Sequence, residues 1–254
     1  MSASDSASPL TVALQAAVPA AGVSPAAGPA GANPGAAGHP VAGAWAPLFA
    51  EDDPISDGRI RAGEAGIEVV DAATGLVLRF LAALVGARTV VQVGTGAGIS
   101  GLWLLRGMRP DGVLTSIDPD AESQRLARGA FRTDGVPPSR TRLIAGSAPA
   151  VLPRLADAGY DLVHLDCPVR EMPECVGEAL RLLRPKGVLV MCRAGTESEA
   201  MEQVRDSLRA DPRLALLFVP VGTGVLAAAV ESPPPAPAAD EESQETPGSE
   251  RRGG

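Results

Sequence analysis

Residues 89–98 read TVVQVGTGAG, a short run of β-branched and apolar residues that ends in three glycines, Gly94, Gly96 and Gly98. The apolar run is typical of a strand that is covered on both faces of a sheet. Glycine lacks a Cβ atom, so the backbone after the strand can turn tightly and lie against a ligand. An apolar run at helical spacing follows and continues to Arg106. The stretch therefore predicts a strand, a ligand-binding turn and a helix.

The same alternation of short apolar runs with longer amphipathic runs continues to residue 230. It indicates an α/β fold in which parallel strands are joined by right-handed helical crossovers. The last two apolar runs are separated by too few residues for a crossover, so we expect them to be antiparallel neighbours. The predicted strands are 89–93, 113–117, 142–145, 160–165, 187–191, 214–219 and 225–230, and the predicted helices besides the one after Gly98 are 58–68, 69–85, 121–131, a short one through Leu155, 173–183 and 197–209.

The composition changes at both ends of the chain. Residues 1–44 are rich in Ala, Pro and Gly and carry a single charge, Asp5, which predicts a disordered arm. Residues 231–254 contain six acids, two arginines and five prolines, which predicts an acidic disordered tail. The intervening residues 45–230 are long enough to bury a core, and we expect them to form one domain.

Charge and cysteine content exclude several classes of protein. The net charge of the chain is −8, and without Asp5 and the predicted tail it falls to about −3, which gives no electrostatic footprint for DNA or RNA. No apolar run is long enough to span a bilayer, and the basic start of a signal peptide is missing because the first basic residue is Arg59. The three cysteines, Cys167, Cys175 and Cys192, do not make a disulfide framework. These features favour a cytoplasmic protein that binds neither nucleic acid nor membrane.

Asp118 follows the second predicted strand, 24 residues after Gly94. A carboxylate at the end of this strand can accept hydrogen bonds from both hydroxyls of a ribose, and ligands of open α/β sheets bind at this edge. The alternative is an ordinary strand–helix turn in which the acid caps the next helix. The glycine spacing differs from the GxGxxG of dinucleotide-binding proteins, and with the two-strand ending it disfavours a nicotinamide-dependent oxidoreductase.

Four segments together resemble a known family: VVQVGTGAGISGLWLLRGMRPDGVLTSIDPD (90–120), GYDLVHLDC (159–167), ALRLLRPKGVLV (179–190) and FVPVGTGVLAA (218–228). With Gly75 placed 19 residues before Gly94, they are similar to the S-adenosylmethionine-dependent O-methyltransferases related to catechol O-methyltransferase, especially the small actinobacterial members. The resemblance implies a Rossmann-like class I methyltransferase fold, a seven-stranded and mostly parallel sheet with one antiparallel strand near an edge and helices on both faces. It also implies S-adenosyl-L-methionine as cofactor, a small-molecule substrate and a homodimer.

The resemblance also assigns roles to matching positions. Gln92 departs from the family, which usually has a glutamate there, and a glutamine can still hydrogen-bond but cannot offset the ammonium charge of the cofactor. The implied cofactor-binding residues are Val70 at the methionine end, the backbone of Gly94, Thr95 and Gly96, Ser100 at the carboxylate, Asp118 at the ribose, Gly146, Ser147 and Ala148 around the adenine, and Asp166 facing the methyl-transfer site. A helix N-terminus at Ser100 suits the cofactor carboxylate.

The metal-dependent members of this family hold a divalent cation with an Asp after the fourth strand and an Asp-Asn pair after the fifth, and a lysine three residues beyond the first Asp is the base. Here Asp166 is present, but the pair is Cys192-Arg193 and Val169 occupies the lysine position. One carboxylate beside an arginine holds a hard cation poorly. We therefore predict no tight metal site and assign Asp166 as a weak general base. The alternative is that Asp166 caps a loop or pairs with Arg193.

Cys167 and Cys192 end neighbouring predicted strands, so their sulfurs could lie close to each other and to Asp166. A soft-metal or redox site is one interpretation, and free buried thiols are the favoured one. His164 lies two residues before Asp166 on the same face of its strand, and we interpret it as a satisfied core histidine rather than as a base.

Two functional hypotheses follow from the intact cofactor motifs and the missing metal ligands. The first is an S-adenosylmethionine-dependent methyltransferase that acts on an oxygen of a small molecule without a tightly bound divalent metal. The second is a catalytically silent relative that binds the cofactor or a partner protein as a sensor or scaffold.

Overall fold

The computed structural model describes residues 45–231 of the 254-residue chain. The predicted arm at 1–44 and all of the predicted tail except Glu231 lie outside the described residues. The strands are β1 (Thr89–Val93), β2 (Val113–Asp118), β3 (Thr141–Ala145), β4 (Tyr160–Leu165), β5 (Leu183–Met191), β6 (Leu214–Val219) and β7 (Val225–Val230). The α-helices are α2 (Asp53–Glu64), α3 (Ala72–Leu84), α4 (Ile99–Gly107), α5 (Ala121–Thr133), α6 (Ala148–Val151), α7 (Met172–Leu182) and α8 (Glu199–Ala210), and the 3-10 helices are η1 (Ala46–Phe49), η2 (Pro138–Arg140), η3 (Leu152–Arg154) and η4 (Val169–Glu171).

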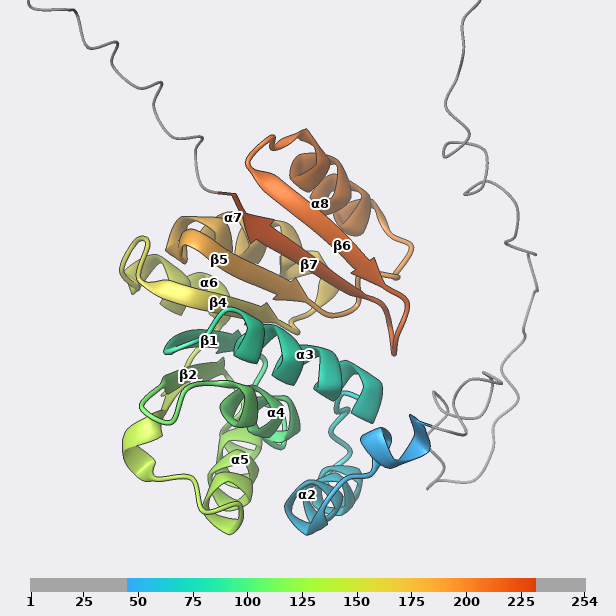
Figure 1. The fold of residues 1–254 in the computed structure, drawn as a ribbon, viewed down its shortest axis with the longest axis vertical. Coiled ribbons are helices and arrows are strands. Elements are labelled where there is room, and N and C mark those ends of the chain that lie inside the picture. Colours follow the sequence, from blue (N-terminus) through green and yellow to red (C-terminus); the bar gives the residue numbers. More distant parts are fainter. Residues whose placement is uncertain (1–44, 232–254) are drawn as a thin grey trace, which may run out of the picture. The chain divides into compact units, whose positions relative to one another are not determined.

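The seven strands form one sheet in the order β3-β2-β1-β4-β5-β7-β6 (Figure 1). β7 runs antiparallel to both β5 and β6, and the other neighbouring pairs are parallel. This confirms the predicted mostly parallel sheet with one reversed strand near an edge. The chain reverses its direction across the sheet between β1 and β4, and such a switch point opens a crevice for ligands at the carboxyl ends of the strands.

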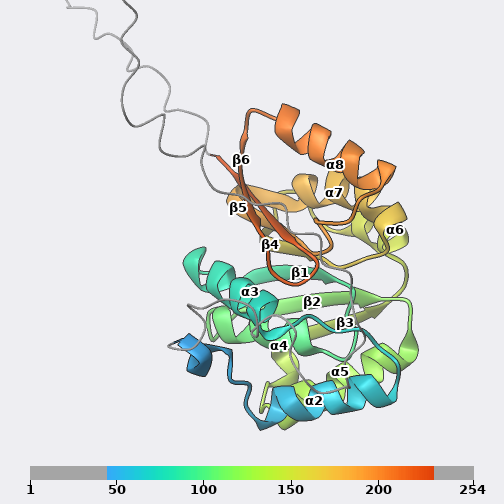
Figure 2. The same cartoon turned by 90° about the vertical axis from the view of Figure 1, so that its right-hand side faces the viewer.

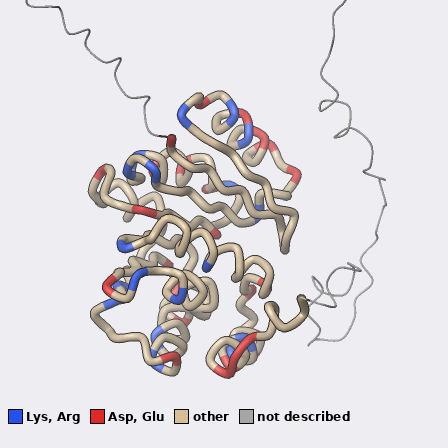
Figure 3. The backbone as a smooth tube through the Cα atoms, in the orientation of Figure 1, with Lys and Arg blue, Asp and Glu red and all other residues tan. Residues whose placement is uncertain are grey.

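Helices cover both faces of the sheet, as predicted. Adjacent residues of β1 show this, because Val90 packs in a core cluster with side chains of α3 and α4, whereas Val91 packs in another cluster with side chains of α7 and α8. Figure 1 shows α3 in front of the strands and α7 behind them. Helix α2 contacts α5 beside the layer formed by α3 and α4 (Figure 2). Charged residues lie mainly on the helices and loops, and β1, β6 and β7 carry none (Figure 3).

The segment before α3 differs from its prediction. The predicted helices 58–68 and 69–85 are wrong at their junction, because α2 ends at Glu64 and α3 begins at Ala72. Gly66 has a left-handed backbone conformation with φ +67°, which stops α2, and Asp71 starts α3 by accepting a hydrogen bond from the Thr74 amide at 2.7 Å. Residues 67–70 are therefore non-helical and lie opposite the glycine turn, where they form one wall of the cavity described below.

Other boundaries also shift, and α2 begins at Asp53, five residues before its predicted start at residue 58. β5 begins at Leu183 instead of residue 187, and α8 begins at Glu199 instead of residue 197. Among the described helices, none is long and apolar enough to cross a membrane.

Candidate active site

A cavity of about 230 Å³ lies at the carboxyl ends of β1, β2 and β4. Its walls come from the segment between α2 and α3, from the glycine turn with the start of α4, and from residues that follow β2, β4 and β5. The lining residues are Ile67, Glu68, Val69, Val70, Gly94, Thr95, Gly96, Ile99, Ser100, Asp118, Ser123, Asp166 and Arg193. The cavity thus lies at the switch point of the sheet and contains seven of the residues implied by the resemblance.

The three glycines of the turn have different structural roles. A Cβ atom on Gly94 would lie 2.3 Å from the backbone oxygen of Asp166, so a side chain there would push β1 and β4 apart. A Cβ atom on Gly96 would project toward Ile67, with its nearest atom at 3.7 Å, and would take up the space between the turn and the opposite wall. A Cβ atom on Gly98 would lie only 2.9 Å from the Cα atom of Ala127 in α5. Only the first two glycines therefore shape the cavity, and the third allows helix packing.

Asp118 is held rigidly against the glycine turn. Its Oδ2 atom accepts hydrogen bonds from the amides of Thr95 at 2.8 Å and Gly96 at 3.2 Å, and its Oδ1 atom accepts one from the Asp120 amide at 2.9 Å. The capping alternative does not describe Asp118, because Asp120 is the residue that caps α5. The backbone groups of the turn thus act by fixing a carboxylate whose remaining lone pairs are available to a ligand.

A chain of buried polar side chains lies behind the turn. The Gln92 amide donates to the Gly94 carbonyl at 3.0 Å and to Ser100 Oγ at 2.7 Å, while its oxygen accepts from Ser116 Oγ at 3.2 Å. Ser116 Oγ lies 2.7 Å from Thr95 Oγ1. A carbonyl oxygen can only accept, so the atom of Gln92 that faces Gly94 must be the NH2 group. Ser100 therefore accepts from Gln92 and keeps its own proton for the cavity.

The Gln92 side chain does not lie next to the cofactor cavity, where the family resemblance places it. The side chain is fully buried and does not line the cavity, so it supports the turn and Ser100 from behind. Gly146, Ser147 and Ala148 also do not line the cavity; Gly146 instead donates to the Asp118 carbonyl at 3.2 Å and joins the end of β3 to the end of β2.

The other side of the cavity holds an ion pair. Arg193 Nε donates to Asp166 Oδ1 at 2.9 Å, and its Nη2 donates to Glu68 Oε2 at 3.3 Å. The sequence analysis gave pairing with Arg193 as one alternative role of Asp166, and the structure contains this ion pair. Burial disfavours the charged guanidinium, but the two carboxylates outweigh burial and raise the pKa of Arg193. The cavity therefore contains a permanent positive charge next to the end of β4.

The backbone of Arg193 has φ +61°, a left-handed conformation that is unfavourable for a residue with a side chain. Three hydrogen bonds to the turn between β6 and β7 hold it there: Arg193 N to Thr223 Oγ1 at 3.2 Å, Ala194 N to Gly224 O at 3.0 Å and Gly195 N to Thr223 O at 3.0 Å. The direction of the arginine is thus imposed by the last hairpin.

The two strand-end cysteines do not meet, so the soft-metal and redox interpretation is wrong. The register pairs Leu165 with Met191, which places Cys167 and Cys192 one residue out of step and on opposite faces of the sheet. Cys167 Sγ lies 3.8 Å from Met172 Sδ, and a hydrogen bond with Cys175 together with burial raises the pKa of the Cys167 thiol. Burial also raises the pKa of Cys192. All three cysteines are free and buried, as the favoured interpretation predicts.

His164 is completely buried and lies outside the cavity lining. Its Nε2 atom is 3.4 Å from Cys192 Sγ, and burial lowers its pKa to about 4 although Asp166 opposes this shift. Its Nδ1 atom has no partner among the described residues, so the histidine is a neutral core residue but is not fully satisfied.

The sequence interpretation missed five of the cavity residues, namely Glu68, Ile67, Val69, Ile99 and Ser123. The signal for the first two was present, because Gly66 followed by the helix-capping pattern at Asp71 marks a break between two helices. For Ser123 no local signal existed, since its place depends on the packing of α5 beside β2.

Known proteins resemble this chain in sequence and in structure. Residues 91–191 match the family model described as a methyltransferase domain. An O-methyltransferase by name from Mycolicibacterium vanbaalenii is 47% identical over 193 residues, which cover 71% of this chain and 85% of that protein. "Probable O-methyltransferase Rv1220c" of Mycobacterium tuberculosis is 49% identical over 192 residues, with 71% and 86% covered. The crystal structure of O-methyltransferase TomG from Streptomyces achromogenes, which is involved in tomaymycin synthesis and is bound to S-adenosylmethionine, has a TM-score of 0.67 at 26% identity, with 73% and 92% covered.

Proposed function

This chain belongs to the S-adenosylmethionine-dependent O-methyltransferase family, and from that premise we propose that it methylates an oxygen atom of a small molecule without a tightly bound divalent metal. Its cofactor is S-adenosyl-L-methionine. The observation that carries the proposal is Asp118, fixed by the amides of Thr95 and Gly96 beside the cavity at the switch point of the sheet. A catalytically silent scaffold is not favoured, because the relatives are named as enzymes.

The cavity fits the cofactor in its chemistry. Asp118 has lone pairs left for the ribose hydroxyls, and Ser100 offers a hydroxyl proton to the cofactor carboxylate at the N-terminus of α4. Gly96 leaves open the space that a Cβ atom would fill, and Val70 contributes an apolar wall. When bound, the cofactor supplies an electrophilic methyl group on a positively charged sulfur. The protein's part is to hold and orient the two reactants.

The residues present do not fit the family's divalent metal. Asp166 Oδ1 already accepts from Arg193, whose positive charge occupies the place of a ligand. The thiol of Cys192 faces His164 in the core, and its raised pKa keeps it protonated. Magnesium and calcium need several oxygen ligands, and among residues 45–231 no cluster of three His, Cys, Asp or Glu side chains could hold a metal.

For an acceptor that binds with its hydroxyl group protonated, Asp166 is our candidate for the general base that accepts the proton. It lies at the end of β4 on the cavity wall with its side chain 21% exposed. Within the described residues only its Oδ1 atom takes part in a hydrogen bond, so Oδ2 is the oxygen that would receive the proton.

We also propose that the protein is a cytoplasmic homodimer. Large apolar side chains are exposed at η1 (Leu48, and Trp45 just before it) and on α3 (Phe80 and Leu84), two elements that contact each other. A second copy of the chain would bury them, and the family resemblance implies a homodimer. Phe80→Asp should shift the protein to a monomer in analytical ultracentrifugation; a wild-type protein that sediments as a monomer would refute the proposal.

Calorimetry with S-adenosylmethionine and S-adenosylhomocysteine tests the proposed function. We expect one site per chain for each ligand, and affinities that change less than about twofold between excess chelator and millimolar magnesium, because no metal contributes to the site. Absence of binding by both ligands would end the proposal, and a strong dependence on magnesium would refute its metal-free part.

A further inference from the structure

Arg193 is the one cationic side chain among the residues that line the cavity, which otherwise include the acids Glu68, Asp118 and Asp166. It lies where the loops after β4 and β5 meet, and it pairs with Asp166 and Glu68. The Arg193 side chain is 34% exposed, so it is neither sealed in the core nor fully solvated. A partly desolvated positive charge at this place attracts negatively charged ligands more strongly than a surface arginine does.

We propose that Arg193 binds the acceptor oxygen in its anionic form, so that the substrates are carboxylates or phenols acidic enough to be ionised at neutral pH. This inference rests on the proposed methyltransferase function and names its substrate class. The arginine then supplies, from the protein itself, the positive charge that a metal ion provides in metal-dependent members of the family.

The hydrogen bonds of Arg193 leave room for such an anion. A guanidinium has five N–H donors. Nε is used by Asp166 and one Nη2 proton by Glu68, while Nη1 makes no hydrogen bond to any described residue. The Glu68 side chain is 85% exposed, so its ion pair is screened by water and easily displaced. Two or three N–H groups can therefore bind an oxyanion without breaking the contact with Asp166.

The arginine is also preorganised. Asp166 holds Nε from one side, and the hydrogen bonds to Thr223 and Gly224 hold the backbone in its left-handed conformation. An unfavourable conformation that the surrounding structure maintains often marks a functional position. Because both ends of the side chain are fixed, less conformational entropy is lost when a ligand binds.

An anionic acceptor can take the methyl group in one displacement step. A lone pair of the carboxylate or phenolate oxygen forms a bond to the methyl carbon, while the carbon–sulfur bond breaks and its electron pair goes to sulfur. The products are a methyl ester or an aryl methyl ether, and neutral S-adenosylhomocysteine. No proton is transferred, so for these acceptors Asp166 positions Arg193 and is not needed as a base.

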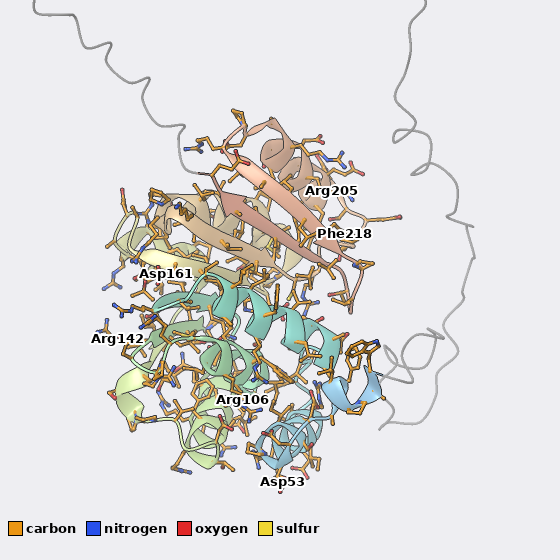
Figure 4. All side chains as sticks on the ribbon, viewed as in Figure 1. Asp53, Arg106, Arg142, Asp161, Arg205 and Phe218 are labelled. Atoms are coloured by element: carbon orange, nitrogen blue, oxygen red, sulfur yellow. The ribbon has the colours of Figure 1, made fainter. Side chains whose placement is uncertain are left out.

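Binding to the protein saturated with S-adenosylhomocysteine tests the inference. Matched probes are benzoate against benzamide, and 4-nitrophenolate against phenol, measured by calorimetry. We expect each anion to bind at least ~10-fold more tightly than its neutral partner, and Arg193→Gln to remove this preference, because a charged hydrogen bond is lost. Arg193→Lys should retain part of the preference. Arg205→Gln, which removes a positive charge from α8 (Figure 4), should change nothing.

The outcomes separate this inference from the function on which it rests. Equal binding of anions and neutral partners, no binding of any anion, or an unchanged preference in Arg193→Gln would overturn it while S-adenosylhomocysteine still binds. Failure of S-adenosylhomocysteine to bind the wild-type protein would instead refute the proposed function. If Arg193→Gln unfolds because Asp166 loses its partner, the double variant Asp166→Asn/Arg193→Gln keeps the charge balanced and gives the same readout.

Discussion

The two sides of the cavity are built in different ways. On the side of β1 and β2, a carboxylate is fixed by three backbone amides, and a chain of buried polar side chains supports the turn behind it. On the side of β4 and β5, Arg193 forms partly exposed ion pairs with Asp166 and Glu68. The side that we propose for the cofactor depends on backbone geometry, whereas the side that we propose for the acceptor depends on which side chains the loops carry. Acceptor chemistry can therefore change without disturbing the sheet or the cofactor.

Replacement of Gly94 should lower stability and cofactor binding most, because it should disrupt both sides of the cavity at once. A valine at this position would meet the backbone oxygen of Asp166, because even its Cβ atom would lie 2.3 Å away. We expect Gly94→Val to lower the free energy of unfolding by at least about 3 kcal/mol and to abolish cofactor binding. Urea denaturation and calorimetry would measure the two effects.

Gly129 on α5 provides the control, because nothing lies within 4 Å of a Cβ atom there. Gly129→Ala should keep cofactor binding and leave stability unchanged or higher by up to about 1 kcal/mol. Wild-type cofactor affinity in Gly94→Val would show that the two sides are not coupled through this contact.

Asp118→Asn should damage the cofactor side alone. Both carboxylate oxygens accept from backbone amides, so either orientation of the asparagine places its NH2 group against at least one N–H donor. We expect the affinity for S-adenosylhomocysteine to fall ~10- to 100-fold, which corresponds to the loss of one or two hydrogen bonds to a charged group. Calorimetry would measure this loss.

Asp161→Asn is the matched control, because Asp161 accepts the amides of Arg88 and Thr89 at the opposite end of the sheet (Figure 4). It should lower stability without changing the affinity. An unchanged affinity in Asp118→Asn would contradict the assigned role of this carboxylate.

Gln92→Glu should change cofactor binding least. For this substitution, the sequence resemblance and the structure predict opposite effects on cofactor affinity. The family resemblance suggests that a glutamate would improve cofactor binding. In the structure a carboxylate could not donate to the Gly94 carbonyl, and Ser100 would have to turn its proton away from the cavity. We therefore expect a loss of about 1 kcal/mol in cofactor binding free energy. Tighter binding than wild type would refute this, and Gln203→Glu on exposed α8 should leave binding unchanged.

The sequence predicted the sheet well because the strands are strongly apolar and the turns are marked by glycine and proline. It also predicted that Gly94, Asp118 and Asp166 would lie together, since each follows a strand whose carboxyl end faces the same edge. The break between α2 and α3 was missed because apolar residues continued at helical spacing across it, and local capping at Asp71 prevailed. Positions that depend on pairing between strands were harder to predict. The faces of Cys167 and Cys192 depend on a one-residue register, and the support given by Gln92 depends on partners in two other elements.

The reversed strand has a consequence for synthesis of the protein. β7 lies between β5 and β6 although it is made last, and the turn before it holds Arg193 in place. During translation the loop that carries Arg193 has no support from this hairpin until Thr223 and the final strand have left the ribosome. In a chain that ends before residue 223, the backbone of Arg193 would lack the hydrogen bonds that hold it in its left-handed conformation.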